Sequence, residues 1–71
     1  MIDPQKYASA VLLAEVWWQQ FFNGNPTPIV EALKPVSDLT PELAELYRLV
    51  SSKGDYSQVK RQRIAANESL K

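Results

Sequence analysis

The sequence predicts an all-α fold, a small bundle of three to four helices organised around a long apolar N-terminal helix. An N-cap residue directly precedes proline three times, at Asp3-Pro4, Thr27-Pro28 and Thr40-Pro41. Each pair favours a helix start, because the cap side chain accepts an unpaired backbone N–H and proline presets the first helical φ. Between these starts apolar residues recur at helical spacing, and no segment alternates as a strand does.

The first helix is expected over residues 4–22, which hold both tryptophans and both phenylalanines. At about 100° per residue, its apolar side chains form one wide face. That face contains Tyr7, Ala10, Val11, Ala14, Trp18, Phe21 and Phe22. Trp17 lies at its edge and Leu13 at its flank, whereas Leu12 and Val16 fall among polar residues. So wide an apolar surface fits either a central helix covered by its own chain or a surface that docks a partner. In the second interpretation the docking residues are Leu12, Leu13, Val16 and Trp17.

Three further helices are expected, over residues 28–34, 41–52 and 56–70. Pro35 ends the first of them, and the second carries a regular stripe of Leu43, Leu46, Tyr47 and Val50. Asp55 and Gln58 form a box-like cap before the last helix. The apolar stripe of that helix is interrupted by Arg63, so residues 67–71 are expected to fray or to await a partner. Gly24 and Gly54 suit the left-handed position that follows a helix.

The 71 residues are expected to form a single helical domain. A chain of this size buries only about 60% of its unfolded surface, and without cysteine it has no disulfide to stabilise it. It therefore depends on close helix packing or on association. The longest apolar run is interrupted by Glu15, Gln19 and Gln20, so no membrane span is expected. The absence of cysteine fits a reducing compartment, and we expect the cytoplasm or an intracellular or viral assembly.

Enzymatic chemistry is not expected. The chain has no histidine and no cysteine, which removes the commonest general base, the thiol nucleophile and most zinc sites. Asp38, Glu42 and Glu45 could in principle hold a hard cation. The simpler interpretation is an acidic first turn that interacts favourably with the helix dipole. We therefore expect no catalytic residue, no metal and no cofactor.

Charge is balanced overall but not along the chain. Residues 1–50 carry six acidic and three basic side chains, and residues 51–71 carry two acidic and five basic ones. Lys60, Arg61 and Arg63 form a basic patch that could meet an acidic protein surface. It could also bind nucleic acid, with Tyr56–Ile64 as the reading helix of a helix-turn-helix. Zero net charge is atypical of DNA-binding proteins.

These observations favour a non-enzymatic helical interaction protein, an adaptor or an assembly subunit, of the kind found among small accessory proteins of bacteria or their phages. The expected partner is another protein or a second copy in a homo-oligomer. The alternative is a small helix-turn-helix-like DNA-binding regulator that uses Lys60, Arg61 and Arg63. No motif in the sequence assigns the chain to a known family.

Overall fold

The computed structural model describes residues 3–71, and it is helical with no strand in that range. Its elements are α1 (Pro4–Leu12), α2 (Glu15–Phe22), α3 (Thr27–Leu33), the 3₁₀ turn η1 (Lys34–Val36), α4 (Pro41–Ser51) and α5 (Tyr56–Ser69). The all-α prediction is confirmed. The predicted count of three to four helices is wrong, since five α-helices occur among the described residues.

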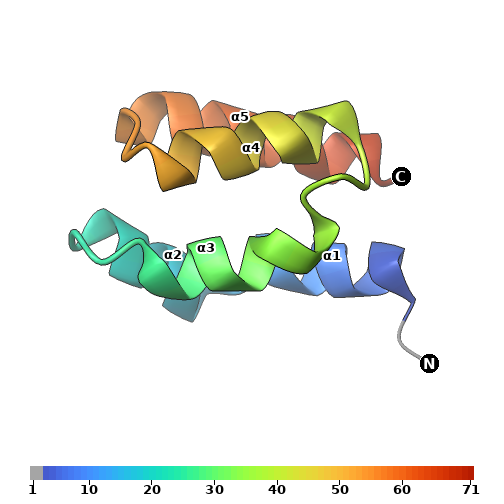
Figure 1. The fold of residues 1–71 in the computed structure, drawn as a ribbon, viewed down its shortest axis with the longest axis horizontal. Coiled ribbons are helices and arrows are strands. Elements are labelled where there is room, and N and C mark those ends of the chain that lie inside the picture. Colours follow the sequence, from blue (N-terminus) through green and yellow to red (C-terminus); the bar gives the residue numbers. More distant parts are fainter. Residues whose placement is uncertain (1–2) are drawn as a thin grey trace.

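The helices form four helical segments, here called legs, which lie along the long axis with each leg antiparallel to the next (Figure 1). The first leg is α1 followed by α2, the second is α3 continued by η1, and α4 and α5 are the third and fourth. Each leg packs on the next, and α5 packs back against α1. The bundle therefore closes around one core, to which every leg contributes.

That core is built only from apolar residues. Its members are Ala8, Val11, Leu12, Trp18, Phe21, Ile29, Ala32, Leu33, Val36, Leu43, Leu46, Val50, Val59, Ala66 and Leu70. Tyr7 lies at its edge, where its hydroxyl donates to the carbonyl of Ala32 at 2.9 Å. Within the described residues no buried side-chain nitrogen or oxygen lacks a hydrogen-bond partner, so the core leaves no polar group unsatisfied.

The long N-terminal helix expected over residues 4–22 is not present as one element. It is broken at Leu13 and Ala14 into α1 and α2. Ala14 has φ −79° and ψ 82°, which lies outside the helical region. This break is the main departure from the sequence prediction, and it determines which side chains of the first leg reach the surface.

Two of the predicted N-caps are confirmed. The Asp3 carboxylate accepts from the backbone N–H of Gln5 at 3.0 Å, and the Thr40 hydroxyl accepts from that of Leu43 at 3.1 Å. The cap predicted at Thr27 is wrong, because α3 begins at Thr27 itself and has no side-chain cap.

Asp55 precedes α5 as predicted, but its side chain makes no capping bond. The two predicted left-handed glycines also behave differently. Gly24 has φ +93°, whereas after α4 the left-handed residue is Lys53, with φ 56°. At Gly54 the backbone instead passes close to α4, because a Cβ there would lie 3.2 Å from the Leu49 carbonyl oxygen. This approach leaves little room for any larger residue.

The end of α5 is docked rather than frayed. Leu70 is buried in the core, and its carbonyl accepts a hydrogen bond from the side-chain amide of Gln5. One residue earlier, the hydroxyl of Ser69 lies 3.1 Å from that of Thr40. The last turn of α5 therefore links the start of α1 to the start of α4. The prediction that residues 67–71 fray is wrong for Ser69 and Leu70, which make these contacts.

Candidate interaction surface

The break in the first leg contains neither proline nor glycine. The N–H of Ala14 bonds to the carbonyl of Val11 at 3.1 Å, and that of Glu15 bonds to the carbonyl of Leu13 at 2.9 Å. These short-range bonds replace the regular i to i−4 ladder. The carbonyls of Val11 and Leu12 thereby lose the partners that a continuous helix would give them.

Two side chains take the place of those partners. The indole nitrogen of Trp18 donates to the carbonyl of Val11 at 3.1 Å, from a buried position. Nε of Arg63, on α5, donates to the carbonyl of Leu12 at 2.6 Å. The end of α1 is therefore capped by one residue from the next helix and by one from the opposite end of the sequence.

Arg63 also joins the two sides of the break. Its Nη2 lies 2.7 Å from Oε1 of Glu15, at the start of α2, and its guanidinium carbon lies 4.8 Å from the centre of the Trp18 ring. The planar guanidinium suits this combination, because one edge can donate two hydrogen bonds while its face stacks on an aromatic ring. A single arginine thus binds α1, α2 and α5 together.

The break separates two neighbouring leucines. Leu12 is 1% exposed in the core, whereas Leu13 is 64% exposed. Leu13 lies beside the exposed Ile64 of α5, and both line a surface hollow of about 210 Å³. Lys60, Arg63 and Asn67 complete its wall with Leu12.

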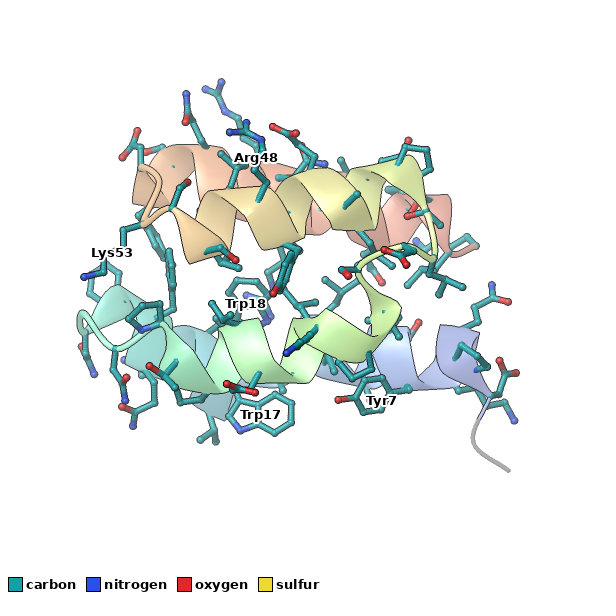
Figure 2. All side chains as sticks on the ribbon, in the orientation of Figure 1. Tyr7, Trp17, Trp18, Arg48 and Lys53 are labelled. Atoms are coloured by element: carbon teal, nitrogen blue, oxygen red, sulfur yellow. The ribbon has the colours of Figure 1, made fainter. Side chains whose placement is uncertain are left out.

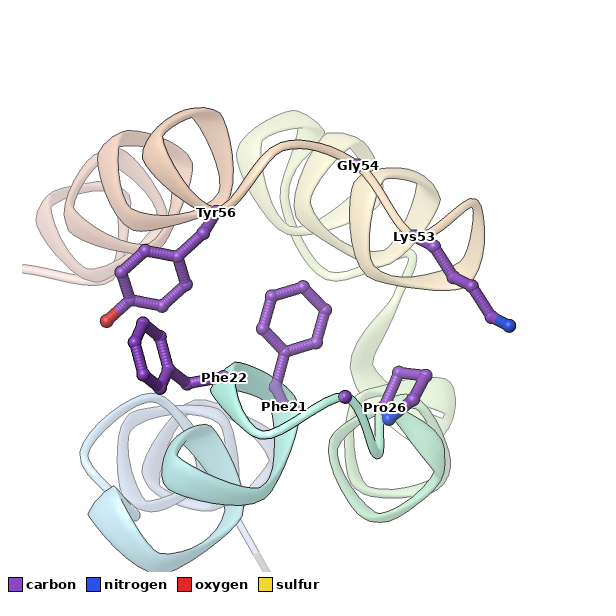
Figure 3. A pocket seen from close by; sticks show the side chains of 7 residues that line it. Phe21, Phe22, Pro26, Lys53, Gly54 and Tyr56 are labelled. Atoms are coloured by element: carbon purple, nitrogen blue, oxygen red, sulfur yellow. The ribbon is translucent and has the colours of Figure 1, made fainter.

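A second apolar cluster lies where α2 ends and α5 begins. The ring centres of Phe22 and Tyr56 are 4.8 Å apart with planes at 71°, an edge-to-face contact between two exposed side chains. Phe21 stacks behind Tyr56 at 6.5 Å and belongs to the core. Figure 3 shows these rings facing one another between the two helices.

These two clusters lie on the same side of the bundle, where α5 runs beside the first leg. Glu15, Trp18, Gln19 and Arg63 line the surface between them, together with Phe22 and Tyr56. We call this side the α5 seam. It consists of Leu13, Ile64, Phe22 and Tyr56, with Glu15, Arg63 and Lys60 among them.

The structure distributes the four predicted docking residues over different places. The prediction for Leu12 is corrected: Leu12 lies on the buried face of α1 with Ala8 and Val11, so its side chain does not face a partner. Leu13 lies on the α5 seam. Val16 is 72% exposed, and Trp17 is exposed as well. Figure 2 shows Trp17 on the outer side of the first leg and Trp18 directed into the bundle.

Sequence reasoning missed three exposed residues of the seam. A continuous helix places Phe22 on its wide apolar face, and the break changes that face. Tyr56 and Ile64 belong to α5, whose buried stripe is Val59, Ala66 and Leu70. Ile64 lies about 140° from the centre of that stripe at 100° per residue. An isoleucine so far from the stripe was the available signal for an exposed apolar position.

The predicted basic patch is divided. Lys60 and Arg63 line the same hollow on the α5 seam, but Arg63 is held by the break and its side chain is only 20% exposed. Arg61 is exposed, and none of the hollows that contain the other two includes it. Only Lys60 and Arg63 therefore line this hollow together.

The acidic residues considered for a cation are not gathered either. Among residues 3–71 no group of three or more acidic side chains lies close enough to hold a metal ion. Glu45 instead forms an ion pair with Arg48 on the outer side of α4. The hydrogen bond from Arg48 holds the pKa of the Glu45 carboxyl below its usual value.

Comparisons with protein-family models, curated proteins and solved structures found no match for this chain. None of the helices within residues 3–71 has both the length and the hydropathy needed to cross a bilayer.

Proposed function

We propose that this chain is a non-enzymatic interaction protein that binds another protein chain through the α5 seam. The supporting observation is the distribution of exposed apolar side chains. Seven large ones are exposed among residues 3–71, and four of them lie on the α5 seam. They are Leu13, Phe22, Tyr56 and Ile64. Scattered single exposures are normal, but apolar side chains gathered on one side mark binding surfaces.

The composition of the seam supports the same function. Aromatic residues supply much of the energy of protein interfaces, and aromatic and arginine side chains are enriched in them. The seam offers Phe22 and Tyr56 at one end and Leu13 and Ile64 at the other, with charged groups among them. The alternative of a DNA-binding regulator has weaker support, because Arg63 is engaged at the break.

The seam can be tested with Ile64→Glu. This variant places a carboxylate in the apolar hollow, and we expect at least a tenfold loss of binding, about 1.4 kcal/mol or more. Glutamate is a good helix former, so α5 is expected to stay folded. The measurement is retention of proteins from an extract of the encoding organism, quantified by mass spectrometry, beside the self-association of the purified chain.

Ala65→Glu is the matched control. It adds the same charge at the next exposed position, outside the hollow. We expect at least one protein that binds the unchanged chain and Ala65→Glu but does not bind Ile64→Glu. Equal binding by both variants and the unchanged chain, or no association of any kind, would count against the proposed function.

A further inference from the structure

We propose that the partner of the α5 seam is a second copy of this chain, bound as a two-fold symmetric dimer with the helices of both copies parallel. This inference rests on the proposed function and names its partner. Three features of the seam support it: the placement of its charges, the pairing of its apolar residues and its size.

The charges of the seam are complementary to their own image. Glu15 stands on the α2 side with its side chain 77% exposed, and Lys60 stands on the α5 side. Lys60 is exposed and has no ion-pair partner among the described residues. A two-fold axis parallel to the helices places the α5 side of one copy against the α2 side of the other. Each Glu15 then faces the lysine at position 60 of the other copy.

The heights of these residues along the bundle agree with such pairing. The contact between Glu15 and Arg63 shows that these two residues lie at the same level. Lys60 is three positions before Arg63, about 4.5 Å along the helix axis at 1.5 Å per residue. A lysine side chain spans that offset. Because the chain has zero formal net charge, the copies do not repel each other as wholes.

The apolar residues pair under the same rotation. Leu13 comes from the first leg and Ile64 from α5, so each Ile64 meets the leucine at position 13 of the other copy. In the same way each Tyr56 meets the phenylalanine at position 22, which extends the existing edge-to-face contact into a cluster of four rings. An isologous interface requires such a patch, one that is complementary to itself.

The size of this side fits a small dimer. The molecule measures 32 by 20 by 17 Å, so a long side covers 32 Å by 17 to 20 Å, roughly 550 to 650 Å². Stable complexes bury about 600 to 1,000 Å² on each partner. A contact through this side can therefore bury at most an area at the lower end of that range, so we expect a dimer that dissociates on dilution.

Analytical ultracentrifugation of the full chain from 5 µM to 1 mM tests the dimer directly. We expect the mass to rise from 8.1 kDa towards twice that value as concentration increases. Lys60→Glu should weaken the dimer at least tenfold, because it sets two carboxylates against each other. Arg61→Glu makes the same change in charge at the neighbouring exposed position, outside the seam hollows, and should leave the dimer intact.

Exchanging the charges at Glu15 and Lys60 tests whether these two residues contact each other across the dimer. Lys60→Glu and Glu15→Lys are each expected to remain monomeric alone, whereas an equimolar mixture should dimerise. In the mixed dimer one pairing is the original contact between Glu15 and Lys60, and the other joins the two substituted side chains, which carry opposite charges. Circular dichroism checks that each variant is folded. If Glu15→Lys does not fold, the concentration series with Lys60→Glu and Ile64→Glu still decides.

Two results would overturn the dimer: a mass of 8.1 kDa throughout the series, or a dimer that Lys60→Glu and Ile64→Glu leave unchanged. A chain that stays monomeric yet captures another protein in an Ile64-dependent manner would remove this inference and keep the proposed function. If the chain neither associates with itself nor captures another protein, the dimer and the proposed function are both wrong.

Discussion

Trp18→Ala is expected to lower the free energy of unfolding by about 3–5 kcal/mol, the range for removing a buried large aromatic residue. Trp18 fills the core, contacts Phe21 edge to face, and carries Arg63 on its ring. Small domains of this size have few kcal/mol to lose. We therefore expect the variant to be largely unfolded at 25 °C, as measured by urea denaturation followed by far-ultraviolet circular dichroism.

Trp17→Ala is the matched control, one residue away in the same helix. Because Trp17 lies at the surface, its loss should cost about 1 kcal/mol or less. Trp18→Phe separates ring volume from hydrogen bonding, since it keeps most of the packing and removes the donor to Val11. We expect this variant to fall between the other two. Equal effects at Trp17 and Trp18 would contradict the orientation of α2.

Arg63→Met is expected to lower the free energy of unfolding by about 1.5–3 kcal/mol, the value of a hydrogen bond from a charged group. Methionine retains an apolar stem, so the loss reports mainly on the guanidinium. Most of the effect is assigned to the Leu12 carbonyl, which is left without this donor. The pair with Glu15 contributes less, because that carboxylate is largely exposed. Urea denaturation midpoints measure the difference.

Arg61→Met supplies the comparison, because Arg61 is exposed and makes no ion pair among the described residues. Its replacement should change stability by no more than about 0.5 kcal/mol. Arg63→Lys should recover part of the loss, since an ammonium cannot donate two bonds along one edge. If Arg63→Met and Arg61→Met were equally stable, the proposed role of Arg63 at the break would be wrong.

The features that local chemistry dictates were predictable from sequence. Asp3 and Thr40 cap helices because a side-chain oxygen, followed by proline, suits that position whatever the tertiary fold. The buried stripe of α4 was read correctly at Leu43, Leu46 and Val50. Thr27 failed as a cap because Pro26 takes that position, so the helix begins one residue earlier than predicted.

The break in the first leg was not predictable in this way. Residues 4–22 contain no proline after Pro4 and no glycine, and their apolar spacing also fits one continuous helix. At the interruption the Leu12 carbonyl accepts a hydrogen bond from Arg63, which is 51 positions away in the sequence. A local pattern cannot contain that information. In α5 the same arginine appeared only as an interruption of an apolar stripe.

Only part of the candidate surface was predictable, because the break that shapes it cannot be seen in the local sequence pattern. Leu13, Val16 and Trp17 are exposed, but a continuous helix gives no basis for separating Leu13 from the buried Leu12. Tyr56 and Ile64 come from a helix that sequence reasoning treated mainly as a basic segment. Their approach to Phe22 and Leu13 requires the closure of α5 against the first leg, which is a tertiary event.

Amide hydrogen exchange of the full chain, resolved by NMR, tests the break that creates this surface. Among residues 3–71 no backbone carbonyl accepts from the N–H of Val16, whereas Trp18 bonds to the carbonyl of Ala14 at 3.2 Å. We expect Val16 to exchange nearly as fast as an unstructured chain, between protected amides in α1 and α2, and the Arg63 Nε proton to exchange slowly. Unbroken protection from Val11 to Phe21 would contradict the break.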